Sequence, residues 1–540
     1  MNKNFLAIKN EISVFFDRHD EIVNVLLVVL TAILFALSHP SPIFLHGQSN
    51  FGFVFFVPFL FLVFQCDIKT SWFWGGLSGV FSYALYAHWL FAFNVFSAIL
   101  VLCMYFFSYA LVSFFLKLAE NFFVGEAFFF ALFFLLCVFE YTKTIGFAGF
   151  SYGVSGYTQW ENEVLLQTAS IFGVWFLTFT IDFFSVAIFV FLKDFFENKF
   201  LQNQKKHIAH FVIFFLTILF ANIYGNVRLQ KKEKAKNFVT VCAIQNNSDP
   251  WQGGISYYEK DVETILSLVK KAMNENPRID IFVLPETAIV PSILQNYKMR
   301  TDRARFDLVK KILEFIENQS AVFVLGNFHA TEAGDFNSSF VFVPKKNVIP
   351  PEPEMYHKIH LVPFTEDFPF AKKNAIVYNL AELLDAHVWE RGTEYKVFHE
   401  KNISFATPIC FEDTFGEDCR RFVKNGAEVF FNQSNDAWAK SETSLMQHLS
   451  MAVFRSVENN VPQVRSTASG LTCVIDERGK IVLQTKPFEE NYVIGKIPRL
   501  ENAGKTFYTK WGDTFAIVFI LASASVLAFL LLKSLKKIEV

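Results

Sequence analysis

The segment ISFATPICFED, residues 403–413, joins an apolar, strand-like run to a thiol and two carboxylates. Cys410 ends the run, and Glu412 and Asp413 follow almost directly. A structural cysteine normally lies inside an apolar run, whereas a cysteine at a strand-to-helix turn beside charged groups can act as a nucleophile. The segment therefore predicts an α/β domain that carries a reactive thiol at the carboxyl end of a buried strand.

A second strand end carries a carboxylate that could act as a base. In IDIFVLPETAIVP, residues 279–291, Glu286 comes directly after Pro285 and an apolar run. Proline has no N–H to donate to a strand ladder, so the strand is expected to stop there, and α/β folds bind ligands at such ends. The alternative interpretation is a solvent-facing loop acid, which is common after strands.

A third segment, MYHKIHLVPFTEDFPF at residues 355–370, carries Lys358 and, eight positions later, Glu366. Lys358 could be a solvated lysine or the cation that stabilises charge near a thiolate. His357 and His360 are three residues apart, but no carboxylate or thiol at ligand spacing completes a set, so we predict no metal. We also predict no cofactor.

The composition of the chain is that of a membrane protein. Its 540 residues are 52% hydrophobic and include 70 Phe, and the mean hydropathy is positive. Basic and acidic residues nearly balance, at 49 and 51, so nothing in the charge favours nucleic-acid binding. The seven cysteines have no C-x-x-C spacing, so neither a disulfide framework nor a zinc site is indicated.

Apolar runs long enough to cross a bilayer recur before residue 226. A spanning helix needs about 20 apolar residues, and the sequence predicts seven spans, at 22–38, 51–66, 70–92, 94–117, 127–147, 164–192 and 208–225. An eighth run covers residues 514–532. Acidic residues beside the first run, and the lack of an A-x-A-like site after it, predict a retained anchor rather than a signal peptide.

The pattern predicts three parts: a membrane domain of about seven helices (1–225), a domain with alternating strand and helix patterns (226–505) and a last membrane helix (506–540). Basic residues in short loops stay on the cytoplasmic side. If the chain has eight spans, the basic residues of the short loops and termini fall on one side of the membrane, and the large domain lies on the outer side. These basic residues are Lys3, Lys9, Arg18, Lys117, Lys193, Lys199, Lys205, Lys206, Lys533, Lys536 and Lys537. A basic cluster at residues 228–236 argues the other way.

The order of Glu, Lys and Cys-aromatic-Glu within one α/β domain resembles the nitrilase, or carbon–nitrogen hydrolase, superfamily. Seven spans, such a domain and a final span together resemble the apolipoprotein N-acyltransferase family over nearly the whole chain. The segments YHKIHLVPFTED (356–367), NQSNDAW (432–438) and VPQVRSTASG (461–470), with Arg465, strengthen the resemblance. It implies an extramembrane α-β-β-α sandwich in addition to the polytopic helical domain.

The resemblance also implies residue roles. Glu286 would be the general base, Lys358 the oxyanion stabiliser and Cys410 the nucleophile. Glu366 and Glu412 match acids that the family uses beside these three residues, and Trp251 in NSDPWQGG matches a functional tryptophan more loosely.

Two positions depart from the family pattern. Phe411 stands where the family often has Tyr, and Thr365 stands where it usually has Gly.

The implied reaction is N-acylation of the lipid-modified N-terminal cysteine of apolipoproteins, with a phospholipid as acyl donor and a cysteine thioester as intermediate. The implied partners are the phospholipid, the diacylglyceryl-modified apolipoprotein and the membrane, with no nucleic acid. The implied location is a bacterial inner membrane, which the chain crosses several times, with the catalytic domain on the periplasmic face.

Two other functions use the same sequence features. A membrane-tethered nitrilase-type amidase would use the same three residues with water as acceptor, but seven N-terminal spans exceed what a tether needs. A transporter or scaffold would need paired ionisable residues inside the spans. Few are present, mainly His88, Glu140 and Lys143, and these could instead contact lipid headgroups.

Overall fold

The computed structural model describes residues 20–249, 252–332, 334–384 and 386–538. The chain divides into two compact units, Leu229–Gly512 and a unit made of Met1–Arg228 with Asp513–Val540. The C-terminal helix therefore belongs to the same unit as the N-terminal helices.

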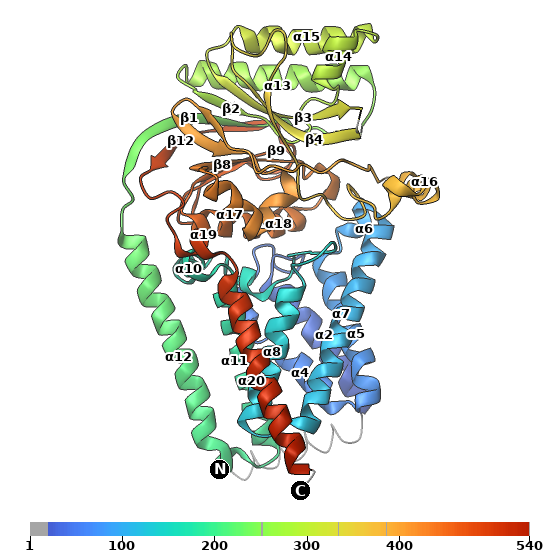
Figure 1. The fold of residues 1–540 in the computed structure, drawn as a ribbon, viewed down its shortest axis with the longest axis vertical. Helices are drawn as coiled ribbons and strands as arrows, with labels where there is room; N and C mark the ends of the chain where they lie inside the picture. The colour runs from blue at the N-terminus through green and yellow to red at the C-terminus, as the bar shows by residue number, and fades with distance from the viewer. Residues whose placement is uncertain (1–19, 250–251, 333, 385, 539–540) are drawn as a thin grey trace. The chain divides into compact units, whose positions relative to one another are not determined.

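The first unit is helical (Figure 1). Its helices are α2 (Asp20–Ser38), α3 (Ser49–Gly52), α4 (Phe56–Gln65), α5 (Ile68–Tyr86), α6 (Leu90–Phe93), α7 (Val95–Phe122), α8 (Glu126–Thr142), η1 (Ser155–Gln159), α9 (Glu163–Leu166), α10 (Ala169–Phe172), α11 (Trp175–Phe196), α12 (Phe200–Gln230) and α20 (Thr514–Ile538). Helices α5 and α7 pack side by side, and α20 packs against α8.

Among the described residues, four helices are long and apolar enough to cross a membrane: α2, α7, α11 and α12. Shorter apolar helical stretches cover Ser49–Gln65, Glu163–Phe172 and Thr514–Phe529. Large apolar side chains such as Phe107 and Phe215 are exposed on this unit. Contiguous apolar surface of this kind is rare on a soluble protein, and with the long apolar helices it makes the chain a membrane protein.

The start of one sequence-predicted span is wrong. The span expected at 164–192 is divided: α9 ends at Leu166, α10 ends at Phe172, and the long helix α11 begins at Trp175. Gly173 between them has φ +64 and ψ −159, a positive-φ conformation that glycine adopts at no steric cost and that interrupts the helix. A hydropathy window does not detect such a break, because the flanking residues are apolar on both sides.

The second unit is an α/β fold with these elements: β1 (Ala235–Gln245), α13 (Ile255–Glu275), β2 (Ile281–Val283), α14 (Ile293–Met299), α15 (Arg303–Glu317), β3 (Val322–Thr331), β4 (Gly334–Phe342), β5 (Glu354–His357), η2 (Ala371–Lys373), α16 (Ala375–Leu383), β6 (Phe398–Glu400), β7 (Ile403–Ala406), η3 (Cys410–Thr414), α17 (Gly416–Lys424), β8 (Val429–Ser434), η4 (Ala437–Ala439), α18 (Glu442–Asn459), β9 (Gln463–Thr467), β10 (Cys473–Ile475), β11 (Ile481–Gln484), β12 (Asn491–Leu500) and α19 (Phe507–Trp511).

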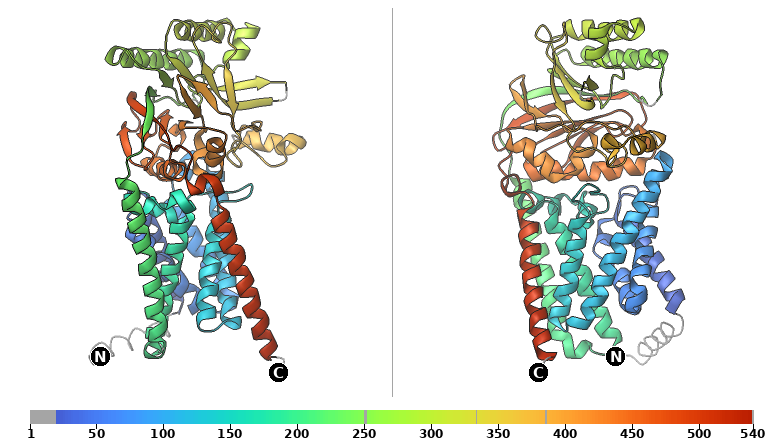
Figure 2. Two further views of the ribbon diagram at one scale, coloured as in Figure 1. Left: turned by 60° about the vertical axis from the view of Figure 1, so that its left-hand side comes forward. Right: turned by 45° about the vertical axis from the view of Figure 1, so that its right-hand side comes forward.

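The strands form two six-stranded sheets, with orders β12-β1-β2-β3-β4-β5 and β11-β10-β9-β8-β7-β6. In each sheet three neighbouring strands are parallel, β1-β2-β3 in one and β7-β8-β9 in the other. Helices α13 and α15 cover the outer face of the first sheet, and α17 and α18 lie against the second (Figures 1 and 2). The layers are therefore helix, sheet, sheet and helix, as the resemblance implied.

Alternation along β1 explains why the two sheets stack. Val241 and Ala243 face the core that also contains Phe405 and Phe431 of the second sheet. The intervening Cys242 and Ile244 face the other core, under α13 and α15. Successive side chains of a strand point to opposite faces, so a strand that is apolar at every position is buried on both faces.

Candidate active site

The turn that carries Cys410 lies at the carboxyl end of β7. Ile409 still forms a parallel bridge with Gln433 of β8, and Cys410 then begins η3 with φ +49. A non-glycine residue in this left-handed region costs about 1–3 kcal/mol and persists where the surrounding structure imposes it, as at functional sites. Cys410 is buried, with 8% of its surface exposed.

Glu286 lies three residues beyond β2, at the carboxyl end of the first sheet's parallel strands. The side-chain amide of Asn337 donates to Glu286 Oε1 at 2.8 Å. The backbone N–H of Asn435 donates to Oε2 at 2.9 Å. Glu286 is 7% exposed, so it is a held, buried carboxylate and not a solvent-facing loop acid.

A glycine on the neighbouring strand makes room for this carboxylate's backbone. Gly326 of β3 donates its N–H to the carbonyl of Pro285 at 3.1 Å. A Cβ at Gly326 would lie 2.5 Å from that carbonyl oxygen and 2.6 Å from the Cα of Glu286. Because contacts this short are not tolerated, any larger residue here would displace Glu286.

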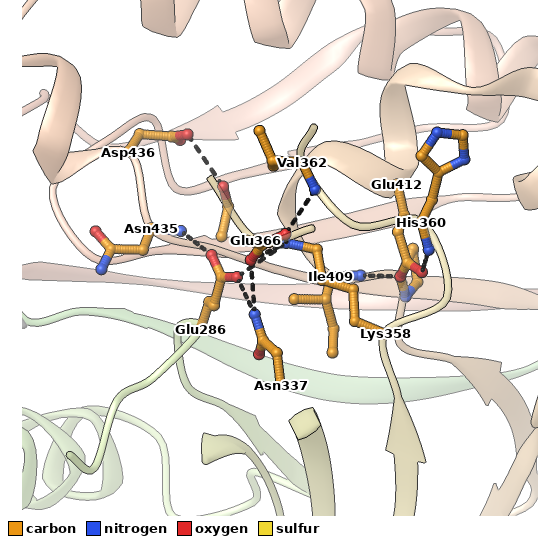
Figure 3. Close-up of polar contacts among 12 residues, drawn as sticks. Glu286, Asn337, Lys358, His360, Val362, Glu366, Ile409, Glu412, Asn435 and Asp436 are labelled. Carbon is orange, nitrogen blue, oxygen red and sulfur yellow. Dashed lines mark hydrogen bonds and ion pairs between the residues drawn. The ribbon is translucent and has the colours of Figure 1, made fainter. Parts of the chain in front are cut away.

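Lys358 directly follows β5 and is 1% exposed, so it is not a solvated lysine. Its Nζ lies 2.8 Å from the Glu366 carboxylate and 3.4 Å from Glu286 Oε1. Glu366 also accepts from the backbone N–H of Val362 at 2.8 Å. The Asn337 amide reaches both carboxylates (Figure 3). One ammonium is thus held between a buried acid, Glu286, and a partly buried acid, Glu366.

The charges explain the protonation states of these groups. Burial raises the pKa of Glu286, and the Lys358 ammonium opposes this rise. Burial lowers the pKa of Lys358, but the Glu366 and Glu286 carboxylates outweigh it and raise the pKa above its ordinary value. Burial and the Glu286 carboxylate raise the pKa of the Cys410 thiol well above 9. The resting thiol is therefore protonated, and it needs a base before it can attack.

Glu412 links the cysteine turn to the lysine segment. Its Oε2 accepts from the backbone N–H of Ile409 at 2.7 Å. Its Oε1 accepts from the Tyr356 hydroxyl and from the backbone N–H groups of Ile359 and His360, at 2.6, 2.8 and 3.1 Å. Burial raises the pKa of Glu412 to about 7, against these donors. Because Ile359 and His360 adjoin Lys358, Glu412 fixes that segment relative to Cys410.

The sequence also singled out Phe411, Thr365 and Trp251. Phe411 is buried in η3, and its ring packs edge-on against Phe415, with centroids 5.0 Å apart. Thr365 makes a turn in which its N–H donates to the carbonyl of Val362 at 3.3 Å. Trp251 lies outside the described residues.

The two histidines near Lys358 bind different partners. His357 Nδ1 lies 2.8 Å from the Ser338 hydroxyl, and His360 Nδ1 lies 2.9 Å from Asp418. Within the described ranges, no group of His, Cys, Asp and Glu side chains has the arrangement of a metal site.

Sequence reasoning missed the amides that hold Glu286. Asn337 lies in β4 and Asn435 directly after β8. No local pattern marks Asn337, whereas Asn435 lies in NQSNDAW and could have been chosen by its position at a strand end. It also gave no role to His448, which lies between two buried aspartates, Asp413 and Asp436. The sequence signal for that contact is that Asp413 directly follows Glu412 and Asp436 directly follows Asn435.

Two protein-family models match the chain. Residues 240–503 match the carbon-nitrogen hydrolase family, and residues 31–187 match the apolipoprotein N-acyltransferase N-terminal domain.

Curated relatives cover nearly the whole chain. Apolipoprotein N-acyltransferase 1 of Treponema denticola is 37% identical, over 96% of this chain and 98% of its own length. Apolipoprotein N-acyltransferase 1 of Treponema pallidum is 35% identical, over 93% and 94%. Apolipoprotein N-acyltransferase of Geobacter metallireducens is 30% identical, over 93% and 94%. The chain belongs to the apolipoprotein N-acyltransferase family of acyltransferases.

Proposed function

We propose that the protein N-acylates the α-amino group of the lipid-modified N-terminal cysteine of apolipoproteins, with a phospholipid as the acyl donor. The observation that carries the proposal is that a buried carboxylate and an ammonium lie together near the cysteine turn. Nζ of Lys358 lies 3.4 Å from Glu286. Burial and the Glu286 carboxylate raise the pKa of the Cys410 thiol, and the Lys358 ammonium lowers it. Such an arrangement suits acyl transfer through a thioester.

In the first half-reaction Glu286 takes the proton of the Cys410 thiol. The thiolate attacks the ester carbonyl carbon of the phospholipid, and Lys358 with a backbone N–H near Cys410 stabilises the oxyanion. A preorganised donor of this kind contributes about 2.7–4 kcal/mol. The C–O bond then breaks, the proton on Glu286 passes to the leaving oxygen, and lysophospholipid departs from a Cys410 thioester.

In the second half-reaction the α-amine of the diacylglyceryl-modified cysteine attacks the thioester carbonyl. Glu286 takes the amine proton, the C–S bond breaks, and the proton returns to the thiolate. The products are an amide on the lipoprotein and the free Cys410 thiol. The chain's own groups supply every proton transfer in this ping-pong cycle.

The proposed organisation follows the three sequence parts. Residues 1–225 would form a membrane domain, residues 226–505 the catalytic domain and residues 506–540 the last of eight spans. Basic loops favour a catalytic domain on the outer face of the membrane. From the family resemblance, that face would be the periplasmic face of a bacterial inner membrane. Both substrates carry acyl chains, which a membrane domain would retain.

Mass spectrometry of the intact protein after incubation with one defined phospholipid tests the proposal. We expect the wild type to gain one acyl chain and to lose it to a diacylglyceryl-cysteine peptide. Cys410→Ala should gain nothing. Cys242→Ala, a buried cysteine under α13 in the other core, is the matched control and should behave as the wild type.

If no adduct forms and the protein releases ammonia from small amides, the amidase function replaces the proposal. An adduct that persists in Cys410→Ala would also contradict it.

A further inference from the structure

His448 of α18 lies at the centre of a buried charge network that the proposed reaction does not use. Its Nε2 is 2.8 Å from Asp413 Oδ1, and its Nδ1 is 3.1 Å from Asp436 Oδ1. An imidazole with a carboxylate at each nitrogen donates from both, so it carries the proton of an imidazolium. His448 is 4% exposed, and both aspartates are buried.

The network joins the two segments that carry the thiol and the partner of its base. Asp413 lies in η3, three residues after Cys410. Asp436 follows Asn435, whose backbone N–H donates to Glu286 at 2.9 Å. His448 is therefore one side chain that bridges the Cys410 turn and the Asn435 loop.

Both ends of this bridge are fixed by further contacts. The Ser434 hydroxyl donates to Asp436 Oδ1 at 3.0 Å. The Asp413 Oδ2 atom accepts from Gln463 at 3.1 Å and pairs with Arg465, both of β9. Two carboxylates thus face two cations, so the buried network is neutral while His448 is protonated.

The charged groups that face His448 set its protonation. They are Asp413 from η3, Asp436 from the loop before η4 and Arg465 from β9. Burial lowers the pKa of His448, but the two carboxylates raise it to about 9. Loss of this proton would leave an uncompensated negative charge near Cys410, whose thiol pKa Asp436 already raises.

We propose that His448 is a positioning residue of the acyl-transfer site: its imidazolium bonds to Asp413 and Asp436 and thereby holds the Cys410 turn in register with the Asn435 loop and Glu286. The inference rests on the roles proposed above for Cys410 and Glu286. It assigns no contact between His448 and either substrate.

His448→Gln tests the inference. Glutamine can replace the Nε2 donor toward Asp413, but it loses the Asp436 bond and the charge. Displacements of about 1 Å in a catalytic group can cost about 100-fold in rate, so we expect kcat to fall about 10- to 100-fold with an unchanged KM for phospholipid. His399→Gln, an exposed histidine of β6 that bonds Ser404, is the control and should match the wild type.

The pH profile separates positioning from simple packing. In the wild type, kcat should fall as the pH rises through about 9, because His448 loses its proton there. His448→Gln should lack this alkaline limb. Asp436→Asn removes one of the carboxylates that raise the His448 pKa. In this variant the alkaline limb of the kcat profile should therefore move to lower pH.

Alkylation of Cys410 by iodoacetamide, followed by peptide mass spectrometry at pH 7.5, needs no acyl substrate. We expect it to slow about 10-fold in His448→Gln. If the wild type transfers no acyl chain but alkylation still slows, the proposed function fails and the positioning role stands. Wild-type alkylation and kcat in a folded His448→Gln would overturn the inference. If His448→Gln does not melt cooperatively, the Asp436→Asn variant decides. An alkaline limb of kcat at the wild-type pH in Asp436→Asn would overturn the inference.

Discussion

The backbone N–H of Asn435 donates to Glu286 Oε2 over 2.9 Å and so joins the carboxyl ends of β8 and β2, which belong to different sheets. The Gln433 side chain adds a second link, because its amide donates to the Leu284 carbonyl at 2.7 Å. The candidate base is therefore oriented by the sheet that carries the candidate nucleophile. The packing of the two sheets against each other therefore also orients Glu286 toward the Cys410 turn.

Glu286→Gln should lower kcat about 100- to 10,000-fold, the range for loss of a general base. The amide keeps the shape of the side chain but cannot take the Cys410 proton. Acyl-enzyme formation, followed by mass in a time course, measures the effect. Glu314→Gln, an exposed residue of α15 paired with Lys310, should leave the rate unchanged. A Glu286→Gln variant that acylates at the wild-type rate would assign the base elsewhere.

Lys358→Met should destabilise the second unit by about 3–5 kcal/mol at pH 7.5, because the buried Glu286 carboxylate and the partly buried Glu366 carboxylate lose their cation. The loss should shrink as the pH falls, since Glu286, whose pKa burial raises, then becomes neutral by taking up a proton. Thermal unfolding of the purified protein in detergent measures both effects. Lys310→Met removes an exposed pair with Glu314 at 3.5 Å and should cost less than about 1 kcal/mol. Equal losses in the two variants would contradict the prediction.

Glu412 should give the wild-type activity an acid limb near pH 7, because its pKa is raised to about 7. Protonation removes the charge that its backbone donors and the Tyr356 hydroxyl bind. The Lys358 segment is then held less firmly in its catalytic position and kcat falls as the pH drops, although burial makes protonated Glu412 the more stable form in the folded chain. In Glu412→Gln this limb should be absent and kcat low throughout. Measurement of kcat from pH 5.5 to 8.5 in both proteins tests this. An unchanged acid limb in Glu412→Gln would assign that limb to another group.

The same residue makes a prediction about stability. Its pKa in the folded chain lies above the ordinary value of 4.5, so folding favours the protonated form. The stabilising contribution is then fully present below about pH 4.5 and is lost as the pH rises through about 7. Relative to Glu412→Gln, the wild type should therefore melt progressively earlier between pH 5 and 8. An opposite trend would show that the four donors outweigh burial.

Glu140→Gln should lower stability and leave the KM for phospholipid unchanged. Glu140 is buried, and it pairs with Lys143 at 2.6 Å and accepts from the Ser155 N–H at 2.7 Å. Lys143 also donates to the Gly153 carbonyl at 2.7 Å. Glu161→Gln, an exposed residue that bonds His46, is the control for melting. A raised KM with an unchanged melting temperature would instead support the headgroup contact.

The ends of elements could be read from sequence where a residue with a distinctive backbone preference marks them. Pro285 marked the end of β2, and the polar residues after Cys410 marked the end of the strand pattern. Boundaries inside uniformly apolar sequence were less accessible, because no polarity change accompanies the break. The division of 164–192 at Gly173 is the example.

Local patterns in the sequence determined that the chain has apolar helices and an α/β domain, that Glu286 and Cys410 each follow a strand, and that Lys358 is a candidate cation. They did so because span length, strand alternation and proline act over a few neighbouring residues. The tertiary structure alone decided that these residues meet, and that Asn337, Asn435 and His448 join them. Those contacts depend on strand order and on the stacking of two sheets, which bring together residues far apart in the chain.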